Sequence, residues 1–105
     1  MEELRVKKIF ITADFHGDDL SLKDCENTDV IVLLSDGHKY TASFFTYAFV
    51  EKLRKENMIT GDNLYGKYFW GKNMVLVENC SPDVIKPVVK NIIEEGEFID
   101  VFRQL

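Results

Sequence analysis

The stretch from Asp29 to Thr46 constrains the fold of this chain most, because it has the pattern of two β-strands joined by a tight turn. An unbroken apolar run, residues 30–34, comes first, and a β-branched and aromatic segment, residues 39–46, follows. Between them, Asp36-Gly37 supplies the positive φ angles that a two-residue hairpin turn needs. We therefore expect an antiparallel sheet at the centre of the fold.

The length and composition indicate one ordinary domain, which we predict over residues 1–105. The chain is 46% hydrophobic and 30% charged, and a chain of this size can bury roughly 65% of its unfolded surface. Its net charge of −5, with scattered basic residues, argues against nucleic-acid binding, whose affinity comes mostly from phosphate neutralisation. We expect no nucleic-acid partner.

Three features predict a cytoplasmic protein that makes no membrane contact. No apolar stretch approaches the roughly 18 residues of a membrane span. The first residues contain no secretory apolar segment. Cys25 and Cys80 lack the paired spacing of a metal or redox motif, so we expect both thiols to be reduced.

Capping signals and hydrophobic periodicity predict the other elements. Thr46 is a suitable N-cap for one helix, and Ser81-Pro82 begins a second helix that Gly96 ends. The tail from residue 98 is open between a short strand and a helical turn. The expected elements are strands over residues 4–12, 30–34, 39–46 and 74–77, and helices over residues 46–58 and 82–95.

This order, β-β-β-α-β-α, predicts an α+β fold in which two helices pack on one face of an antiparallel sheet of about four strands. The strands at residues 30–34 and 74–77 are apolar on both faces, whereas two helices cover only one. Burying a few such side chains is worth several kcal/mol at about 25 cal/mol per Å². We therefore expect the tail, the acidic loop at residues 14–29 or another chain to cover the second face, and we hypothesise a homodimer or a partner surface there.

Asp14-Phe15-His16-Gly17-Asp18, directly after the first strand, resembles the first metal-binding segment of metallophosphoesterases. The resemblance implies that Asp14 and His16, with Asp18 as a further candidate, hold divalent ions that activate water. The later histidine segments of that family are absent, and only one other histidine, His38, is present. A metal-dependent hydrolase is therefore an alternative function, and a polar loop is the other interpretation of this segment.

Other catalytic signals are weak. Asp36 could orient His38, but a turn residue that faces water is the common case. No G-x-S-x-G motif occurs, and Cys80 is best interpreted as a small residue in a strand-to-helix connection. We predict no catalytic residue and no cofactor.

The aromatic segment from Tyr65 to Lys72 is the best candidate for recognition. Adjacent rings flanked by Gly-Lys pairs could form an apolar platform with a basic rim, and Trp and Tyr are enriched in interface hot spots. The alternative is that one side of the segment lies in the core; both hold if Phe69 is buried and its neighbours are exposed. The predicted surface comprises Tyr65, Tyr68, Phe69, Trp70 and Lys72.

From Asp29 onward, several segments resemble small uncharacterised bacterial proteins. The shared segments are Ser35-Asp36-Gly37, residues 40–46, Gly66-Lys67-Tyr68-Phe69-Trp70 and residues 74–78. The resemblance implies a bacterial origin and a compact α+β domain, and it assigns no activity.

We therefore expect a small acidic, non-enzymatic protein–protein interaction module that acts through its aromatic segment and exposed sheet face. Immunity proteins and antitoxins that neutralise a basic partner are one version of such a module. A metal-dependent hydrolase and a sensor that binds a small ligand between sheet and helices are the alternatives.

Overall fold

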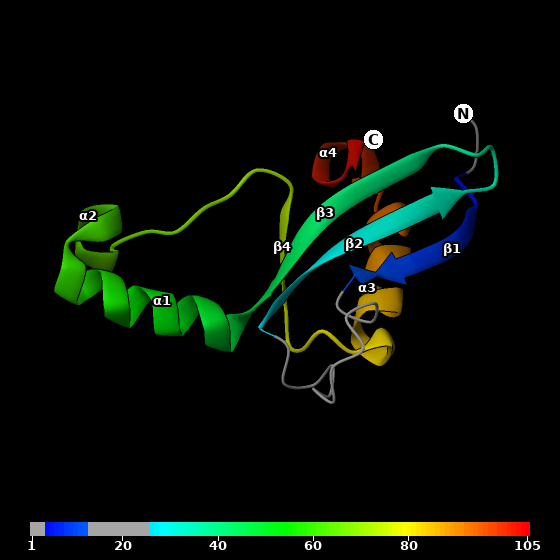
Figure 1. Ribbon diagram of the computed structural model, residues 1–105. Helices are drawn as coiled ribbons and strands as arrows, with labels where there is room; N and C mark the ends of the chain where they lie inside the picture. Colours follow the sequence, from blue (N-terminus) through cyan, green and yellow to red (C-terminus); the bar gives the residue numbers. More distant parts are fainter. Residues whose placement is uncertain (1–3, 13–25) are drawn as a thin grey trace.

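The computed structural model describes residues 4–12 and 26–105 and confirms an α+β fold (Figure 1). The sheet has the strand order β1-β2-β3-β4, and a short β5 pairs with β3 beside β4. The elements are β1 (Val6–Ile11), β2 (Asn27–Leu34), β3 (Lys39–Thr46), α1 (Tyr47–Thr60), α2 (Asp62–Gly66), β4 (Met74–Val77), α3 (Pro82–Glu94), α4 (Phe98–Val101) and β5 (Arg103–Gln104).

The predicted hairpin forms from β2 and β3, but its turn is one residue longer than expected. The Gly37 N–H donates to the Leu34 carbonyl (3.0 Å), and the Leu34 N–H donates to the His38 carbonyl (2.9 Å). Gly37 has a positive φ of 91°, whereas Asp36 does not. This is the three-residue loop in which a type I turn precedes a left-handed glycine. The Asp36 carboxylate stabilises it by accepting the His38 N–H at 2.9 Å.

The fourth strand pairs with β3 in the parallel direction, with Ser43 opposite Met74 and Thr46 opposite Val77. The antiparallel pairing that the sequence predicts holds for β1 with β2, β2 with β3, and β3 with β5. A parallel pair needs a long crossover, and here residues 47–73 make it.

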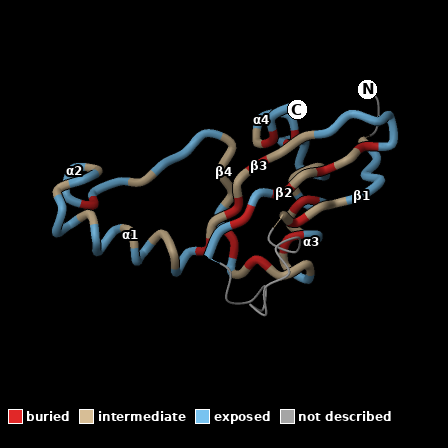
Figure 2. Tube along the Cα trace, viewed as in Figure 1, coloured by how far each residue is buried: buried red, intermediate tan, exposed pale blue. Residues whose placement is uncertain are grey.

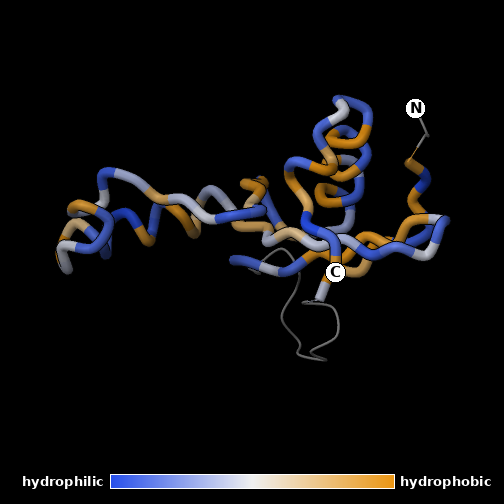
Figure 3. Tube along the Cα trace, turned by 90° about the horizontal axis from the view of Figure 1, so that it is seen from above, coloured by the Kyte–Doolittle hydropathy of each residue, from blue (hydrophilic) through white to orange (hydrophobic). Residues whose placement is uncertain are grey.

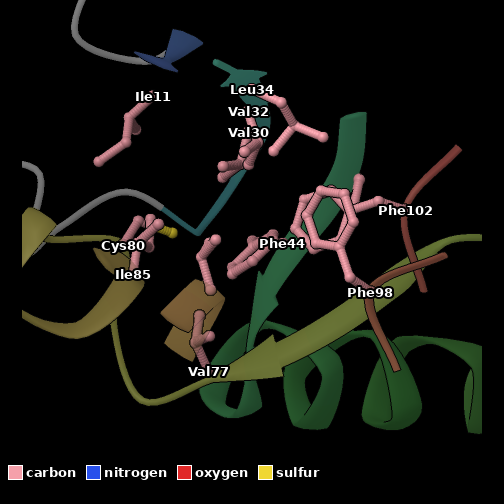
Figure 4. Close-up of a cluster of buried hydrophobic side chains, with 12 residues drawn as sticks. Ile11, Val30, Val32, Leu34, Phe44, Val77, Cys80, Ile85, Phe98 and Phe102 are labelled. Carbon is pink, nitrogen blue, oxygen red and sulfur yellow. The ribbon is translucent and has the colours of Figure 1, made fainter. Parts of the chain in front are cut away.

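One face of the sheet carries the core. Ile85 and Val89 of α3 are fully buried in one cluster with Val30 and Val32 of β2. Figure 4 shows Ile85 and the two valines of β2 in this cluster. The ring of Phe44 from β3 lies 6.1 Å from that of Phe102, which stacks on Phe98 at 4.6 Å.

Of the two helices predicted on this face, the one over residues 82–95 packs there as α3, whereas the one over residues 46–58 forms as α1 and buries no residue. The short α4 packs beside α3 instead, and the tail forms both a helical turn and a strand.

The opposite face carries Phe10, Ile31 and Phe45, which are half-buried. Among the described residues, no helix lies over this face (Figure 3). A partner on this face stays a prediction.

Candidate interaction surface

Residues 47–73, which we call the arm, leave the end of β3 and project away from the sheet before returning to β4 (Figures 1 and 2). The predicted helix after Thr46 forms as α1, yet it contains no buried residue. The radius of gyration is 15.1 Å and the molecule is 47 Å long, whereas a compact domain of this size has a radius near 13 Å. The arm therefore stands apart from the core.

Local interactions define the ends of α1. Thr46 is the N-cap, and its Oγ1 accepts the Phe49 N–H at 3.1 Å. Gly61 ends the helix in a left-handed conformation with φ of 90°. On the surface, a hydrogen bond from Arg54 lowers the pKa of the Glu51 carboxyl and raises the pKa of Arg54. Because isolated helices of 12–15 residues are marginal in water, these contacts alone are weak support for α1.

Aromatic rings anchor the base of the arm. Phe45 of β3 stacks on Phe49 of α1 at 5.9 Å, and Phe69 meets Phe45 edge-on at 6.0 Å. Phe69 is half-buried by this contact, whereas its neighbours Tyr68 and Trp70 are 51% and 71% exposed. Phe69 thus packs on Phe45 outside the core cluster, while the flanking rings face solvent. The recognition role of the segment stays a prediction.

The tip of the arm is a left-handed turn. Asn63, Leu64 and Tyr65 of α2 have φ between 52° and 59°, a conformation that costs roughly 1–2 kcal/mol for each residue with a side chain. Gly66 is buried against α1, where an added Cβ would lie 2.5 Å from the Arg54 carbonyl oxygen. Strained backbone of this kind clusters at ligand clamps and switch regions.

Large hydrophobic side chains are exposed mainly on the arm. Seven of the eleven that are exposed in the described residues lie there, although the arm is only 27 residues long. Single exposed apolar side chains are normal, whereas clusters mark interaction sites. The seven are Tyr47, Met58, Ile59, Leu64, Tyr65, Tyr68 and Trp70. The predicted surface included three of these residues, Tyr65, Tyr68 and Trp70, and missed the other four. For the missed residues near the tip, the sequence signal is the pair of glycines at 61 and 66, which indicates a tight turn.

Lys72, the last residue of the predicted surface, lies at the base of the arm. It is exposed and lines a shallow polar pocket of about 270 Å³ with Asp29, Ser43 and Arg103. The Ser43 hydroxyl donates to the Asp29 carboxylate at 3.0 Å. The adjacent Asn73 side chain donates to the Val101 carbonyl at 2.9 Å, which fastens the returning chain to α4.

Of the other candidate residues, the structure describes Asp36, His38 and Cys80. Asp14, His16 and Asp18 lie outside the described residues. Within residues 4–12 and 26–105, no group of three metal-ligating side chains occurs. His38 Nδ1 lies 3.0 Å from the Asp36 carboxylate on the exposed hairpin turn, and the His38 N–H is the main cause that lowers the pKa of Asp36. Cys80 is fully buried in the core.

Comparisons with known proteins identify no relative of this chain. No family model matches the chain, and neither a curated protein nor a solved structure is detectably similar to it. The resemblance to small bacterial proteins stays a prediction. In the described part of the chain, no helix is long and apolar enough to cross a membrane.

Proposed function

We propose that this protein is a non-enzymatic protein–protein interaction module and that the arm is its docking element. The observation that carries the proposal is the exposed ring of Trp70 on a projecting arm whose helix buries no residue. Interface hot spots are enriched in Trp and Tyr, and Trp70, Tyr68 and Tyr65 follow one another along the same segment. A partner that covers them would also supply the packing that α1 lacks.

The charge of the arm defines the kind of surface that fits it. The arm carries five basic and three acidic residues, whereas the whole chain has a net charge of −5. A complementary partner surface is therefore apolar at its centre and acidic at its rim. The proposal places this interaction in the cytoplasm, because Cys25 and Cys80 lack the spacing of a disulfide framework. It places the protein in a bacterium because of the resemblance to small bacterial proteins.

Substitution of Trp70 tests the proposal. Trp70→Ala should leave the melting temperature unchanged, because the side chain is largely exposed, and it should weaken capture of partners from a native lysate. Ile99→Ala on α4 is the matched control, because Ile99 is also exposed but lies outside the arm. Equal capture by the native protein and the Trp70 and Ile99 variants would exclude the arm as the docking element, and unfolding of Trp70→Ala would place Trp70 in the core.

A further inference from the structure

The edge strand β1 and the second half of α3 enclose a groove on the body of the protein, apart from the arm (Figure 1). Its volume is about 390 Å³, near the lower end of the range for pockets that hold small ligands. Val89 on its floor is fully buried and Val6 is 38% exposed, so the groove suits a few side chains of a short segment. Its apolar lining comprises Leu4, Val6, Ile9, Val89 and Ile93.

The rim of the groove is basic, although the chain as a whole has a net charge of −5. Lys86 and Lys90 of α3 line it against the single carboxylate of Glu94, and Lys7 lies exposed on β1. In the part of the chain that the structure describes, none of these three lysines forms an ion pair. Lys86 and Lys90 are four residues apart on the helix, a spacing at which like charges destabilise it. An anionic group bound between them would offset this repulsion.

Protection of the sheet edge explains only part of this charge. Lysines and bulges on an edge strand discourage pairing with another strand, and β1 has both, with its bulge between Val6 and Lys8. Lys86 and Lys90, however, lie on α3, on the other side of the groove from the strand. These two lysines repel a basic segment and attract an acidic one.

Beyond the bulge, the backbone of β1 offers hydrogen-bonding groups to such a segment. The Leu34 N–H donates to the His38 carbonyl in the hairpin. Ile31 lies three residues earlier, so its backbone faces β1, where Phe10 is its partner. Because N–H and C=O groups alternate between the two edges along a strand, those of Ile9 face the outer edge of β1. Among the described residues, β1 pairs with β2 alone.

We infer that the β1–α3 groove binds an extended acidic segment of a partner protein. The segment adds a strand to the sheet at Ile9. Alternate side chains of this strand face the groove, where the apolar ones lie on the floor and the carboxylates reach Lys86 and Lys90. Strand addition of this kind draws its affinity from main-chain hydrogen bonds, which suits a groove with little exposed apolar surface. This docking surface is separate from the arm, so it does not depend on the proposed function.

Fluorescence anisotropy with a labelled synthetic peptide tests the groove. Every second residue of the peptide is threonine, and the positions between alternate valine and glutamate, so that one face of the strand carries both groups that the groove accepts. The native protein should bind this peptide, and a counterpart with glutamine for glutamate should bind at least about tenfold more weakly.

Charge reversal tests the role of the rim. Lys86→Glu should weaken binding of the glutamate peptide at least about tenfold. Lys39→Glu is the matched control, because Lys39 is equally an exposed lysine but lies on β3 outside the groove, and it should change the affinity by less than about twofold. Both side chains are exposed, so each variant should fold by circular dichroism.

Amide hydrogen exchange tests strand addition. The bound peptide should slow exchange of the Ile9 amide at least about tenfold, because the amide gains a main-chain hydrogen bond. The Ile31 amide already faces β1 and should be unaffected. Peptide binding that leaves Ile9 unprotected would refute the extended, strand-paired conformation.

Three other outcomes would overturn the inference. The first is that the glutamate peptide fails to bind even at millimolar concentration or binds no better than its glutamine counterpart. The second is a labelled oligothymidylate that binds more tightly than the peptide and loses its affinity in Lys86→Glu, because the surface would then be a site for nucleic acid. The third is loss of peptide binding in Trp70→Ala, which would place the peptide on the arm. Failure in the groove leaves the proposed function standing, because the lysate experiment tests the arm.

Discussion

Substitution of Gly66 by alanine should open the arm while leaving the body of the protein folded. Gly66 is buried with φ of 79°, and an added Cβ would lie 2.5 Å from the Arg54 carbonyl oxygen and 3.0 Å from Met58 Cγ. The methionine side chain can move aside. The carbonyl oxygen belongs to the backbone of α1 and can yield only if the helix itself shifts.

The expected cost has two parts. A left-handed conformation costs a residue with a side chain about 1–2 kcal/mol, and forcing an extra methyl group into a packed site costs about 1–3 kcal/mol. The sum is about 2–5 kcal/mol, which is large for a helix that has no buried residue. The stability of the core should stay unchanged, because none of the buried residues of the core comes from the arm.

Amide hydrogen exchange measures this effect residue by residue. In Gly66→Ala, the amides of α1 should exchange at least about tenfold faster, since 1.4 kcal/mol corresponds to a factor of ten, and the amides of β2 should exchange at the native rate. Gly96→Ala is the matched control: its φ is 75°, but nothing lies within 4 Å of the added Cβ. If α1 exchange in Gly66→Ala stays within about twofold of the native rate, the steric reasoning is refuted.

Three further predictions concern the N-cap of the arm and the body. Thr46→Ala removes the N-cap bond to Phe49 and should lower the free energy of unfolding of α1 by about 1 kcal/mol, which exchange of its first-turn amides would show. Phe44→Ala creates a cavity at a fully buried ring and should cost about 3–5 kcal/mol in urea denaturation; a smaller loss would contradict the described core. The pKa of Asp36 is lower in the folded protein than in the unfolded chain. The ionised carboxylate therefore stabilises the turn fully above the pKa that Asp36 has in the unfolded chain, and this stabilisation is lost as the pH falls through its pKa in the folded protein. A carbon-13 NMR titration of the Asp36 carboxyl should find a midpoint below that of an ordinary aspartate.

The elements that the sequence predicted well are those with local signals. Asp36-Gly37 marks the hairpin, Thr46 begins a helix and Pro82 begins another, because turn and cap preferences depend only on neighbouring residues. The length of the turn was wrong by one residue, since Asp-Gly also fits a type I turn with a left-handed glycine.

The placement of α1 and the direction of β4 could not be predicted in the same way. The apolar side of α1 predicts that Phe49 and Leu53 pack against another surface. It does not indicate whether that surface is the sheet of the same chain or another molecule. The apolar run of β4 is equally compatible with parallel and antiparallel pairing. Both features depend on residues far apart in the chain, as the Asn73 bond to Val101 illustrates.

The candidate surface was predictable in composition but not in orientation. Consecutive aromatics at residues 68–70 indicate a recognition segment, yet only the contact between Phe69 and Phe45 determines which rings face solvent. The left-handed tip could not be foreseen at Leu64, because leucine disfavours positive φ and adopts it here only through the closure of the turn on α1.

The separation between the arm and the core makes the fold tolerant of change in the arm, the segment proposed to bind a partner. In the part of the chain that the structure describes, every hydrophobic side chain of the buried core comes from residues 11–12, 26–44 or 77–102, and none comes from residues 47–73. Under the proposed function, substitutions at Tyr68 or Trp70 can therefore alter what the arm binds without unpacking the domain that holds it. A protein built in this way can acquire a new specificity while its thermal stability stays constant.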